Sequence, residues 1–354
     1  MNFDPIDFLA AAVETPSHES VDEMRTLLRE TLLEAGIEST VDPAGNLIAE
    51  KGSGRPHVLL NTHLDTVAPH HPLERTRSEI SGRGSCDAKA SIAVMLAAFL
   101  AIEPKAGQVT LALTPDEEQE STGAHALEVD ADGVIVGEPT GLDVCIAARG
   151  RFQGTITIAG RGAHAADPAS GANAIEGLES VLAGLATYDD RHGPDPSQRL
   201  GEPTLTPTLV SGGEASNRIP AQAELTIDRR AVPPETESEF FPTLETHLQE
   251  TLPTDLSLTV GRAERDTPFL GGFETDPDAD VSTALQAAGA GGPRVFGAAT
   301  EAAYFAEVAP TVVFGPGVLT DAEGPVAHGE REYVRIEDVR DGAKILTEAL
   351  ESLL

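Results

Sequence analysis

The chain of 354 residues exceeds the size at which one hydrophobic core usually keeps growing, so we expect two domains. Its formal net charge of -34 argues against a nucleic acid or an anionic membrane as a partner, because phosphate binding requires a positive surface. A surface this acidic and poor in lysine is typical of a halophilic protein, in which salt screens the repulsion between carboxylates; an ordinary acidic cytosolic enzyme is the alternative.

The first part of the chain alternates between helices and strands. Apolar residues recur with helical spacing in some segments, and short apolar runs bounded by turn residues indicate buried strands. Helices are predicted over residues 4–13, 19–35 and 90–102, and strands over residues 39–41, 46–50, 57–61 and 134–137, with a further strand beginning at Leu111.

The strand from Leu111 runs directly into Asp116, Glu117 and Glu118. Open α/β sheets place their chemistry at the carboxyl ends of strands, so two adjacent carboxylates there suggest one proton-transfer group beside one metal ligand. Because the chain has 58 Asp and Glu residues, a solvated surface is the alternative for this pair taken alone.

His63 and Asp65 end the strand-like run HVLLNTHLDT. In an extended segment this H-x-D spacing places both side chains on one face, so Asp65 can accept a hydrogen bond from the second nitrogen of a metal-bound His63. A histidine in a polar loop is the alternative.

Three more candidate ligands occupy comparable positions. Asp87 follows the glycine-rich turn GRGSC, Glu138 ends the strand GVIVG, and His328 follows a late Gly-Pro-Gly. Asp87 could instead stabilise the N-terminus of the helix that follows it. Oxygen and imidazole ligands gathered at the ends of several strands are nevertheless what a zinc site with open positions requires.

The pattern changes at Arg151. Strands over residues 152–159, 203–210, 221–230 and 255–260 and helices over residues 174–186 and 235–251 follow in the order β-α-β-β-α-β. This order is ferredoxin-like, so we expect a separate domain inserted into the first. The predicted division is residues 1–149 (catalytic domain, first part), 150–263 (inserted domain) and 264–354 (catalytic domain, second part).

After the insertion the first domain resumes. A helix is predicted near residues 280–288, short strands over residues 294–296 and 311–314, and a closing helix over residues 336–354.

The motifs, taken in order, resemble one known family, the di-zinc peptidases and deacylases that include acetylornithine deacetylase, succinyl-diaminopimelate desuccinylase, aminoacylase and glutamate carboxypeptidase. The residues that carry the resemblance are His63-x-Asp65, Gly82-Arg83-Gly84 with Asp87-x-Lys89, Asp116-Glu117-Glu118, Gly137-Glu138-Pro139-Thr140, Ala163-His164 and the late Gly-Pro-Gly followed by His-Gly. The resemblance implies an α/β fold with a central mixed sheet flanked by helices, a di-zinc site at strand ends, and an inserted ferredoxin-like α+β dimerisation or lid domain.

The resemblance also implies two Zn2+ ions, for which Co2+ can substitute. The implied ligands are His63 and Glu138 on one ion, Glu118 and His328 on the other, and Asp87 between the two. Glu117 would be the general base that takes a proton from water and passes it to the leaving amine, with Asp65 supporting the site.

Further roles follow from the same resemblance. The segment GRGAHAADP is similar to the one whose histidine reaches the partner subunit's active site in family dimers, so His164 would stabilise the oxyanion and the protein would be a homodimer. Asn217 and Arg230 match positions that face the substrate's carboxylate in relatives. Thr300 begins the loop Thr300-Glu301-Ala302, which is more similar to acetylornithine deacetylases, and is taken as a substrate-binding residue.

The implied function is a zinc-dependent amidohydrolase that releases the amine from an N-acyl amino acid. A metallo-carboxypeptidase or dipeptidase using the same site is one alternative, and a non-catalytic relative is another. Retention of Glu117 and of every implied ligand argues against the non-catalytic relative.

Other features carry less information. Cys86 and Cys145 fit neither a disulfide framework nor a C-x-x-C motif, and the N-terminus lacks the features of a signal peptide, so we expect a cytoplasmic protein. The remaining histidines are assigned to the surface or to packing: His18, His57, His70, His71, His125, His192 and His247.

Overall fold

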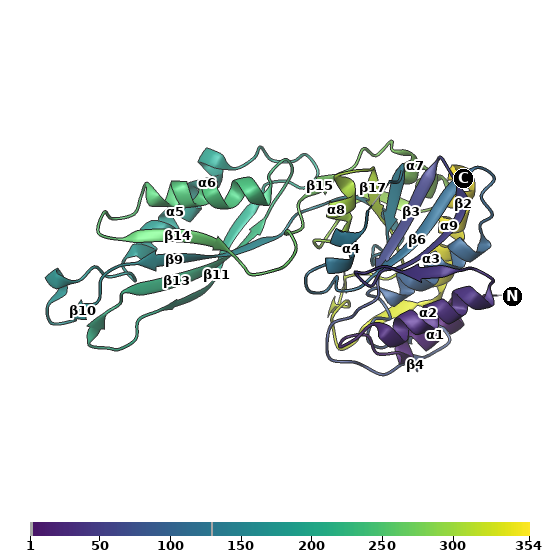
Figure 1. The fold of residues 1–354 in the computed structure, drawn as a ribbon, viewed down its shortest axis with the longest axis horizontal. Helices are drawn as coiled ribbons and strands as arrows, with labels where there is room; N and C mark the ends of the chain where they lie inside the picture. The colour runs from purple at the N-terminus through teal and green to yellow at the C-terminus, as the bar shows by residue number, and fades with distance from the viewer. Residues whose placement is uncertain (1–2, 129) are drawn as a thin grey trace. The chain divides into compact units, whose positions relative to one another are not determined.

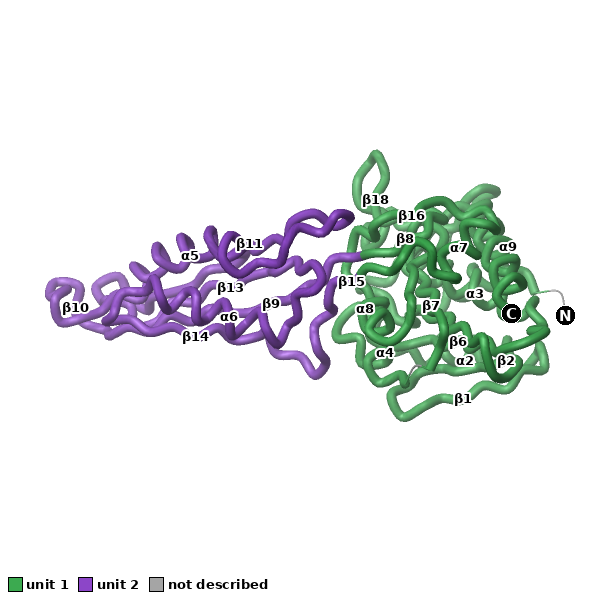
Figure 2. Tube along the Cα trace, turned by 90° about the horizontal axis from the view of Figure 1, so that it is seen from above, with its two compact units in different colours: residues 1–147, 274–354 green, residues 148–273 purple. Residues whose placement is uncertain are grey.

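The computed structural model describes residues 3–128 and 130–354, which form two compact units (Figure 2). Unit 1 comprises Met1–Ala147 and Glu274–Leu354, and unit 2 comprises Ala148–Phe273. The boundary predicted at 263/264 comes too early. Residues up to Phe273 stay with unit 2, because Phe269 packs into the core of that unit and its backbone N–H donates to the Glu237 carboxylate at 2.7 Å.

A nine-stranded mixed sheet forms the centre of unit 1 (Figure 1). Its strands are β1 (Ser39–Val41), β2 (Leu47–Ser53), β3 (His57–His63), β6 (Gly107–Thr114), β7 (Gly133–Val136), β8 (Asp143–Ala148), β15 (Phe273–Glu274), β16 (Gly291–Phe296) and β17 (Thr311–Val313). The order across the sheet is β1-β2-β6-β3-β7-β17-β8-β15, with β16 pairing with β8. The predicted mixed sheet is confirmed.

The central strands β6, β3, β7 and β17 run parallel to one another, whereas β1, β2 and β8 are antiparallel to their neighbours. Parallel strands covered on both faces by helices are almost wholly apolar, which explains the buried runs of β3, β6 and β7. His63 pairs with Thr114, so the ends of β3 and β6 lie together and the loop that begins at Pro115 starts beside His63.

Helices cover this sheet. They are α1 (Pro5–Glu14), α2 (Asp22–Glu34), α3 (Lys89–Ala101), α4 (Thr122–Ala126), α7 (Asp280–Ala287), α8 (Ala302–Ala306) and α9 (Ile336–Leu353). Helix α3 is buried on almost every side, because it packs against α1, α9 and the sheet. Its Leu96 shares one core with Leu9 of α1 and Leu346 of α9. Among the described residues, no helix is both long enough and apolar enough to cross a membrane.

Two small sheets complete unit 1. One contains β4 (Glu74–Arg75), β5 (Glu79–Ser81) and β20 (Tyr333–Arg335), and the other contains β18 (Thr320–Asp321) and β19 (Gly324–Pro325). Strand β20 pairs with β5, which brings the segment that follows His328 beside the segment that precedes Asp87.

Unit 2 is an antiparallel four-stranded sheet with two helices. Its elements are β9 (Phe152–Ala159), α5 (Gly177–His192), β11 (Thr204–Gly212), β13 (Gln222–Arg230), α6 (Glu237–Gln249) and β14 (Ser257–Arg262), together with the short β10 (Ala163–His164), η1 (Pro168–Ser170) and β12 (Arg218–Ile219). The sheet order is β11-β13-β9-β14, which is the predicted ferredoxin-like arrangement.

The two ends of β13 have different neighbours. Arg229 pairs with Phe152, close to where the chain enters unit 2, and Gln222 pairs with Ala159 at the other end. Strand β10 follows the latter end of β9 and pairs with β12 just before β13 begins. The eight residue steps along β13 separate its ends by about 27 Å.

Candidate active site

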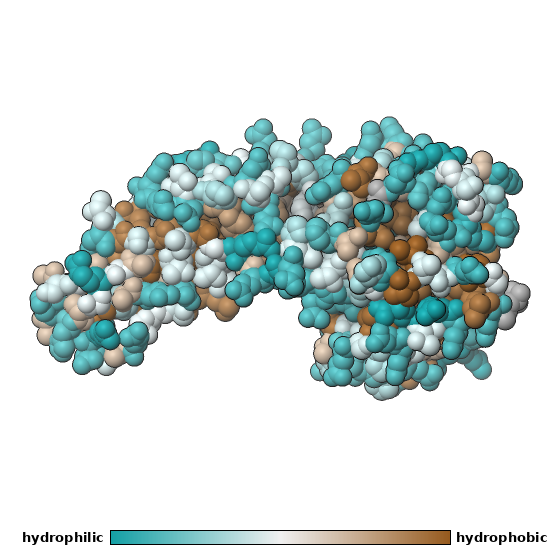
Figure 3. Space-filling view, in the orientation of Figure 1, coloured by the Kyte–Doolittle hydropathy of each residue, from teal (hydrophilic) through white to brown (hydrophobic). Residues whose placement is uncertain are grey.

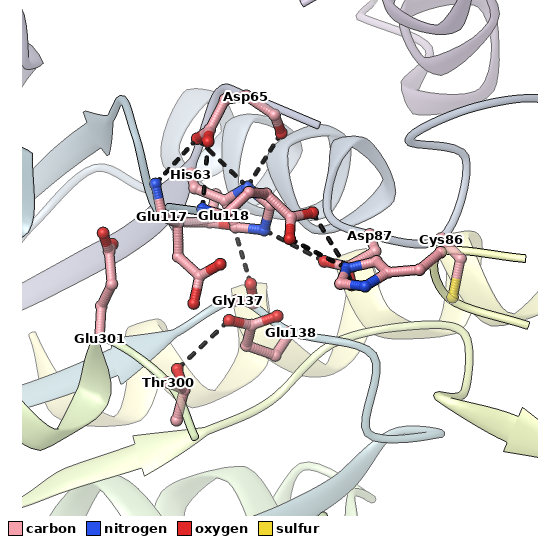
Figure 4. A network of polar contacts seen from close by, with 12 residues as sticks. His63, Asp65, Cys86, Asp87, Glu117, Glu118, Gly137, Glu138, Thr300 and Glu301 are labelled. Atoms are coloured by element: carbon pink, nitrogen blue, oxygen red, sulfur yellow. Dashed lines mark hydrogen bonds and ion pairs between the residues drawn. The ribbon is translucent and has the colours of Figure 1, made fainter. Parts of the chain in front are cut away.

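Asp87 lies at the centre of two groups of potential metal ligands in unit 1 (Figure 4). In each group the ligand atoms all lie within 4.8 Å of one another. The groups are His63, Asp87 and Glu138, and Asp87, Glu118 and His328. The structure thus brings together all five residues that were predicted as ligands: His63 ends strand β3, and the other four lie in loops that follow β5, β6, β7 and β19.

His63 is buried between Asp65 and Asp87. Its Nε2 lies 3.1 Å from Oδ1 of Asp87, while its Nδ1 donates to the backbone carbonyl of Asp65 at 3.0 Å. The nearer carboxylate oxygen of Asp65 is 3.6 Å from Nδ1, so the backbone carbonyl makes the shorter contact. A donating Nδ1 leaves Nε2 with its lone pair, which is the form of imidazole that binds a metal.

The Asp65 carboxylate accepts hydrogen bonds from the backbone of the neighbouring loop instead. Its Oδ1 accepts the N–H of Glu117 and its Oδ2 accepts the N–H of Glu118, each at 3.1 Å. The chain turns sharply just before this pair, where Asp116 has a φ of 73°. Asp65 therefore fixes the backbone of both glutamates.

Glu118 and Glu117 then take different positions. The Glu118 carboxylate is 3.0 Å from Nε2 of His328, which is itself 3.3 Å from Oδ2 of Asp87. Glu117 belongs to neither ligand group. One carboxylate of the pair thus belongs to a potential cation site, and the other, which is half-buried, does not.

A buried ion pair holds Asp87 in place. The backbone N–H groups of Cys86 and Asp87 both donate to Oε1 of Glu332 at 3.0 Å, and Glu332 pairs with Arg83 at 2.7 Å. The side chains of Arg83 and Glu332 are 2% and 1% exposed. Since Glu332 follows His328 closely in sequence, it ties the His328 segment to Asp87.

Thr300 and Glu301 lie against the same group. The Thr300 hydroxyl donates to Oε1 of Glu138 at 3.2 Å, so Thr300 orients a candidate ligand. Glu301 is buried, and its Oε2 accepts from the Thr114 hydroxyl at 2.9 Å. Burial raises the pKa of Glu301 to about 8.

The carboxyl groups and imidazoles perturb each other's pKa values. Burial, and then the charge of Glu138, raises the pKa of Glu117 well above its usual range. Burial, and then the charge of Asp87, does the same for Glu138. Hydrogen bonds to Asp87 and Glu118 raise the pKa of His328 to about 10.

The residues fit a pair of divalent cations. Without them, several carboxylates share a buried space with only imidazolium protons to balance them, which is costly at low dielectric. Carboxylate oxygen and imidazole nitrogen are also the donors that Zn2+ binds at catalytic sites.

Comparison with known proteins identifies the protein family. Residues 59–352 match Peptidase family M20/M25/M40. The chain belongs to this family. As an M20 family member it is a hydrolase, as the resemblance predicted.

Two relatives span almost the whole chain. A protein named LysW-lysine/LysW-ornithine hydrolase from Pyrobaculum aerophilum is 32% identical over 96% of this chain and 94% of its own length. An acetylornithine deacetylase from Pectobacterium carotovorum is 27% identical over 95% of each chain. One is named a hydrolase and the other a deacetylase, and both names include ornithine.

A solved structure shares the fold. The Bacillus subtilis YxeP protein, described as a dinuclear metal-binding peptidase of the M20 family, matches with a TM-score of 0.75 at 16% identity. The match covers 99% of this chain and 97% of that one. The structural match therefore includes both units of this chain.

The other predicted site residues lie in unit 2. His164 is exposed, and its Nδ1 accepts the N–H of Ala166 at 3.1 Å. Asn217 is its neighbour, because the Asn217 carbonyl accepts the N–H of Ala165 at 2.9 Å. Arg230 is at the other end of β13, where its Nε donates to Asp228 at 2.7 Å.

Sequence reasoning missed Glu332 and Glu301, and it gave Arg83 no partner. The glycines on both sides of Arg83 indicated an unusual turn. The loop that contains Glu301 was also identified from the sequence, but Thr300 was predicted as its functional residue. For Glu332 the sequence carries no signal, because it is one carboxylate among 58 acidic residues.

Proposed function

We propose that this M20 hydrolase is a zinc-dependent deacylase that releases a diamino acid, such as ornithine or lysine, from its N-acyl form. The observation that carries the proposal is the pair of ligand groups that share Asp87, with the half-buried Glu117 next to Glu118 but outside both groups. This arrangement provides for two cations and a separate base, which amide hydrolysis by activated water requires.

The proposed ligands are His63 and Glu138 on one side of Asp87, and Glu118 and His328 on the other. Two bound zinc ions would supply Lewis acidity, lowering the pKa of a water molecule and polarising the scissile carbonyl. Glu117 would take the proton of that water and deliver it to the leaving nitrogen, so that the amide C–N bond breaks to give a carboxylic acid and a free amine. Asp65 would hold the backbone of Glu117 during both transfers.

The substrate class rests on the two relatives. Their names share ornithine as the amino acid, and each aligns with almost the whole of this chain. The groups attached to ornithine in the two names differ, so the relatives support the amino-acid product more strongly than the group that is removed. Peptidase activity on dipeptides or tripeptides is the alternative.

We further propose a homodimer. His164 and Asn217 lie near one end of β13 and Arg230 lies at the other, about 27 Å apart by the rise of the strand. One small substrate cannot reach both ends within a single chain. If both ends contact the substrate, one set of residues comes from a second subunit, and His164 would supply the oxyanion donor in trans.

An exposed apolar surface on unit 2 is available for such an interface (Figure 3). Strand β11 lies at the edge of its sheet, where Leu209 and Val210 are 69% and 64% exposed. Ile175, just before α5, and Leu182, within α5, are also exposed. Unpaired edge strands that expose apolar side chains are suited to pairing with another chain.

A substrate panel tests the function. Purified protein would be treated with a chelator, reloaded with zinc or cobalt, and assayed on acetylornithine, succinyl-diaminopimelate, simple N-acetyl amino acids and dipeptides. We expect metal-dependent release of ornithine from acetylornithine. Faster cleavage of dipeptides would favour the peptidase, and no hydrolysis of any amide in the metal-loaded protein would contradict the proposal.

A further inference from the structure

Glu301 is a buried carboxyl group beside the metal groups that the proposed reaction does not use. Figure 4 shows it on the Glu117 side of these groups, away from Asp87, and its charge acts on Glu117. The residue is 1% exposed. Its Oε2 accepts from the Thr114 hydroxyl at 2.9 Å, but its Oε1 is buried without a hydrogen-bond partner among the described residues. Because leaving a buried carboxylate oxygen unpaired is costly, this atom marks a place for a donor.

A second buried acceptor lies next to the first. Nδ2 of Asn61 donates to the hydroxyl oxygen of Thr114 at 3.3 Å, the same oxygen that contacts Glu301. Nδ2 also donates to the Ala112 carbonyl at 3.2 Å, which identifies Oδ1 as the free end of the amide. Oδ1 has no partner among the described residues, and Asn61 is fully buried. The two side chains that share the Thr114 hydroxyl thus each have an acceptor oxygen without a donor.

These acceptors are close to the first metal group. Thr114 pairs with His63 across β6 and β3. Thr300, which precedes the buried glutamate, donates to the candidate ligand Glu138 at 3.2 Å. Asn61 and His63 are two residues apart in β3, so their side chains leave the same face of the strand about 7 Å from each other. The free oxygens are therefore within reach of a molecule bound at His63 and Glu138.

The chemistry of the two free atoms selects a cation that donates hydrogen bonds. An ammonium group has three N–H donors and no acceptor, which matches acceptors that lack donors, and its charge balances the carboxylate. In an extended diamino acid this group lies about 6 Å from the amide nitrogen for ornithine and about 7 Å for lysine. These lengths match the separation of Asn61 from His63.

We propose that Glu301, with the amide oxygen of Asn61, binds the side-chain ammonium of the diamino acid and so selects the amino-acid part of the substrate. This inference rests on the proposed deacylase function and assigns part of its specificity to a residue of unit 1. Glu301 acts on substrate binding, and not on metal binding or on the base Glu117. A substrate without the amine leaves the buried carboxyl group unpaired, which makes it a poor substrate.

A matched pair of substrates separates this role from hydrolysis itself. Nα-acetylornithine and Nα-acetylnorvaline have the same carbon skeleton and differ only in the terminal amine. The zinc-loaded wild type should hydrolyse the ornithine compound at least about 10-fold more efficiently, as kcat/KM, because its amine forms charge-assisted hydrogen bonds. Nα-acetyllysine would be assayed as well, to vary the distance between the amide and the amine.

Three variants complete the experiment. Glu301→Gln removes the charge and keeps the shape, and its amide N–H can donate to Asn61, so the fold should be retained. Its ornithine-to-norvaline ratio of kcat/KM should fall by about 10-fold or more, mainly through the KM of the ornithine compound. Glu301→Asp withdraws the charge by one methylene, so the preference should move from ornithine toward lysine. Glu307→Gln, which removes an exposed carboxylate at the end of α8, is the control and should keep both ratios.

Metal content and melting temperature would be measured for each variant. The inference is overturned if the wild type does not prefer the ornithine compound, if Glu301→Gln keeps that preference, or if Glu301→Gln lowers both substrates by the same factor. In these cases the wild type still hydrolyses Nα-acetylornithine, so the proposed function stands.

One variant remains decisive if another fails. Should Glu301→Gln lose its metal or its fold, an unchanged lysine-to-ornithine ratio in Glu301→Asp overturns the inference. If the metal-loaded wild type hydrolyses none of the three substrates, the proposed function is overturned and the inference with it.

Discussion

Asp65 holds the backbone of Glu117, whose N–H donates a 3.1 Å hydrogen bond to Oδ1 of the Asp65 carboxylate. The second oxygen makes the same contact with the next residue, so each carboxylate oxygen of Asp65 accepts a hydrogen bond from this loop. Asp65 therefore acts on the proposed base more directly than on His63, to which its own backbone carbonyl makes the shorter contact.

This relationship predicts the effect of Asp65→Asn. The substitution keeps the size of the side chain but replaces one acceptor with a donor, leaving one backbone N–H without a partner. We expect kcat to fall by about 10- to 100-fold while both metal ions stay bound. Kinetics and metal analysis of the purified variant would check this, with the exposed Glu34→Gln as the control. A variant with wild-type kcat would show that the loop holds its position without Asp65.

Glu117→Gln should separate the base from the ligands. It removes the proton acceptor and keeps the shape, so hydrolysis should fall by about 10²- to 10⁴-fold with metal content unchanged. Glu118→Gln should instead lower the affinity for one of the two ions. Loss of metal from the Glu117 variant would mean that the two roles are reversed.

The buried pair of Arg83 and Glu332 makes a stability prediction. Glu332→Gln leaves the Arg83 guanidinium buried without its counter-charge and weakens the support of Asp87. Breaking a buried pair on one side costs about 3 to 5 kcal/mol. Urea unfolding followed by circular dichroism would measure the cost, with the exposed Glu330→Gln as the matched control. An equal midpoint for both variants would contradict the prediction.

Salt dependence tests the halophilic interpretation. If repulsion among carboxylates limits stability, the melting temperature should rise steeply between ~0.1 M and ~2 M potassium chloride, because the ions screen that repulsion. Scanning calorimetry over a salt series would show this. A flat profile would favour an ordinary acidic enzyme.

Subunit mixing tests the proposed dimer. His164→Ala and Glu117→Gln should each be nearly inactive alone, because one lacks the oxyanion donor and the other the base. In a mixed dimer with His164 acting in trans, one site collects both defects and the other none. Equal random mixing gives mixed dimers in about half of the cases, so activity should recover to about a quarter of wild type.

Subunit exchange itself would be followed with two distinguishable tags. If exchange is complete and activity does not return, His164 acts within its own chain or has no catalytic role. Mixing Glu117→Gln with Glu118→Gln is the matched control. Each chain supplies both Glu117 and Glu118 to its own site, so each site of a mixed dimer carries one defect and no recovery is expected.

The sequence was most informative where the fold itself gathers side chains. Parallel neighbours such as β3 and β6 end at the same edge of the sheet, so His63, which ends β3, and Glu118, which follows β6, were expected to lie close together. The β-α-β-β-α-β order of unit 2 could likewise be read largely from periodicity, because β9, β13, α5 and α6 each bury one face.

Side-chain partners and domain edges were not predictable in this way. Glu332 meets Asp87 only through the pairing of β20 with β5, a contact between segments far apart in sequence. Thr300 was predicted to bind the substrate, and the sequence carried no sign that its hydroxyl donates to Glu138. Phe269 was placed beyond the insertion because the extended segment around it has no periodicity that reveals which core it joins.

The order in which the two units can fold follows from the insertion of one unit into the other. Unit 2 is a single continuous stretch and can fold once its residues have left the ribosome, whereas unit 1 must wait for Glu274–Leu354. When unit 2 has just left the ribosome, the nascent chain already contains His63, Asp87 and Glu138. It still lacks His328 and the Glu332 carboxylate that accepts hydrogen bonds from the backbone at Asp87. If the site holds two cations as proposed, the one between Asp87, Glu118 and His328 can bind only after the C-terminal segment has been synthesised and has added its strands to the central sheet.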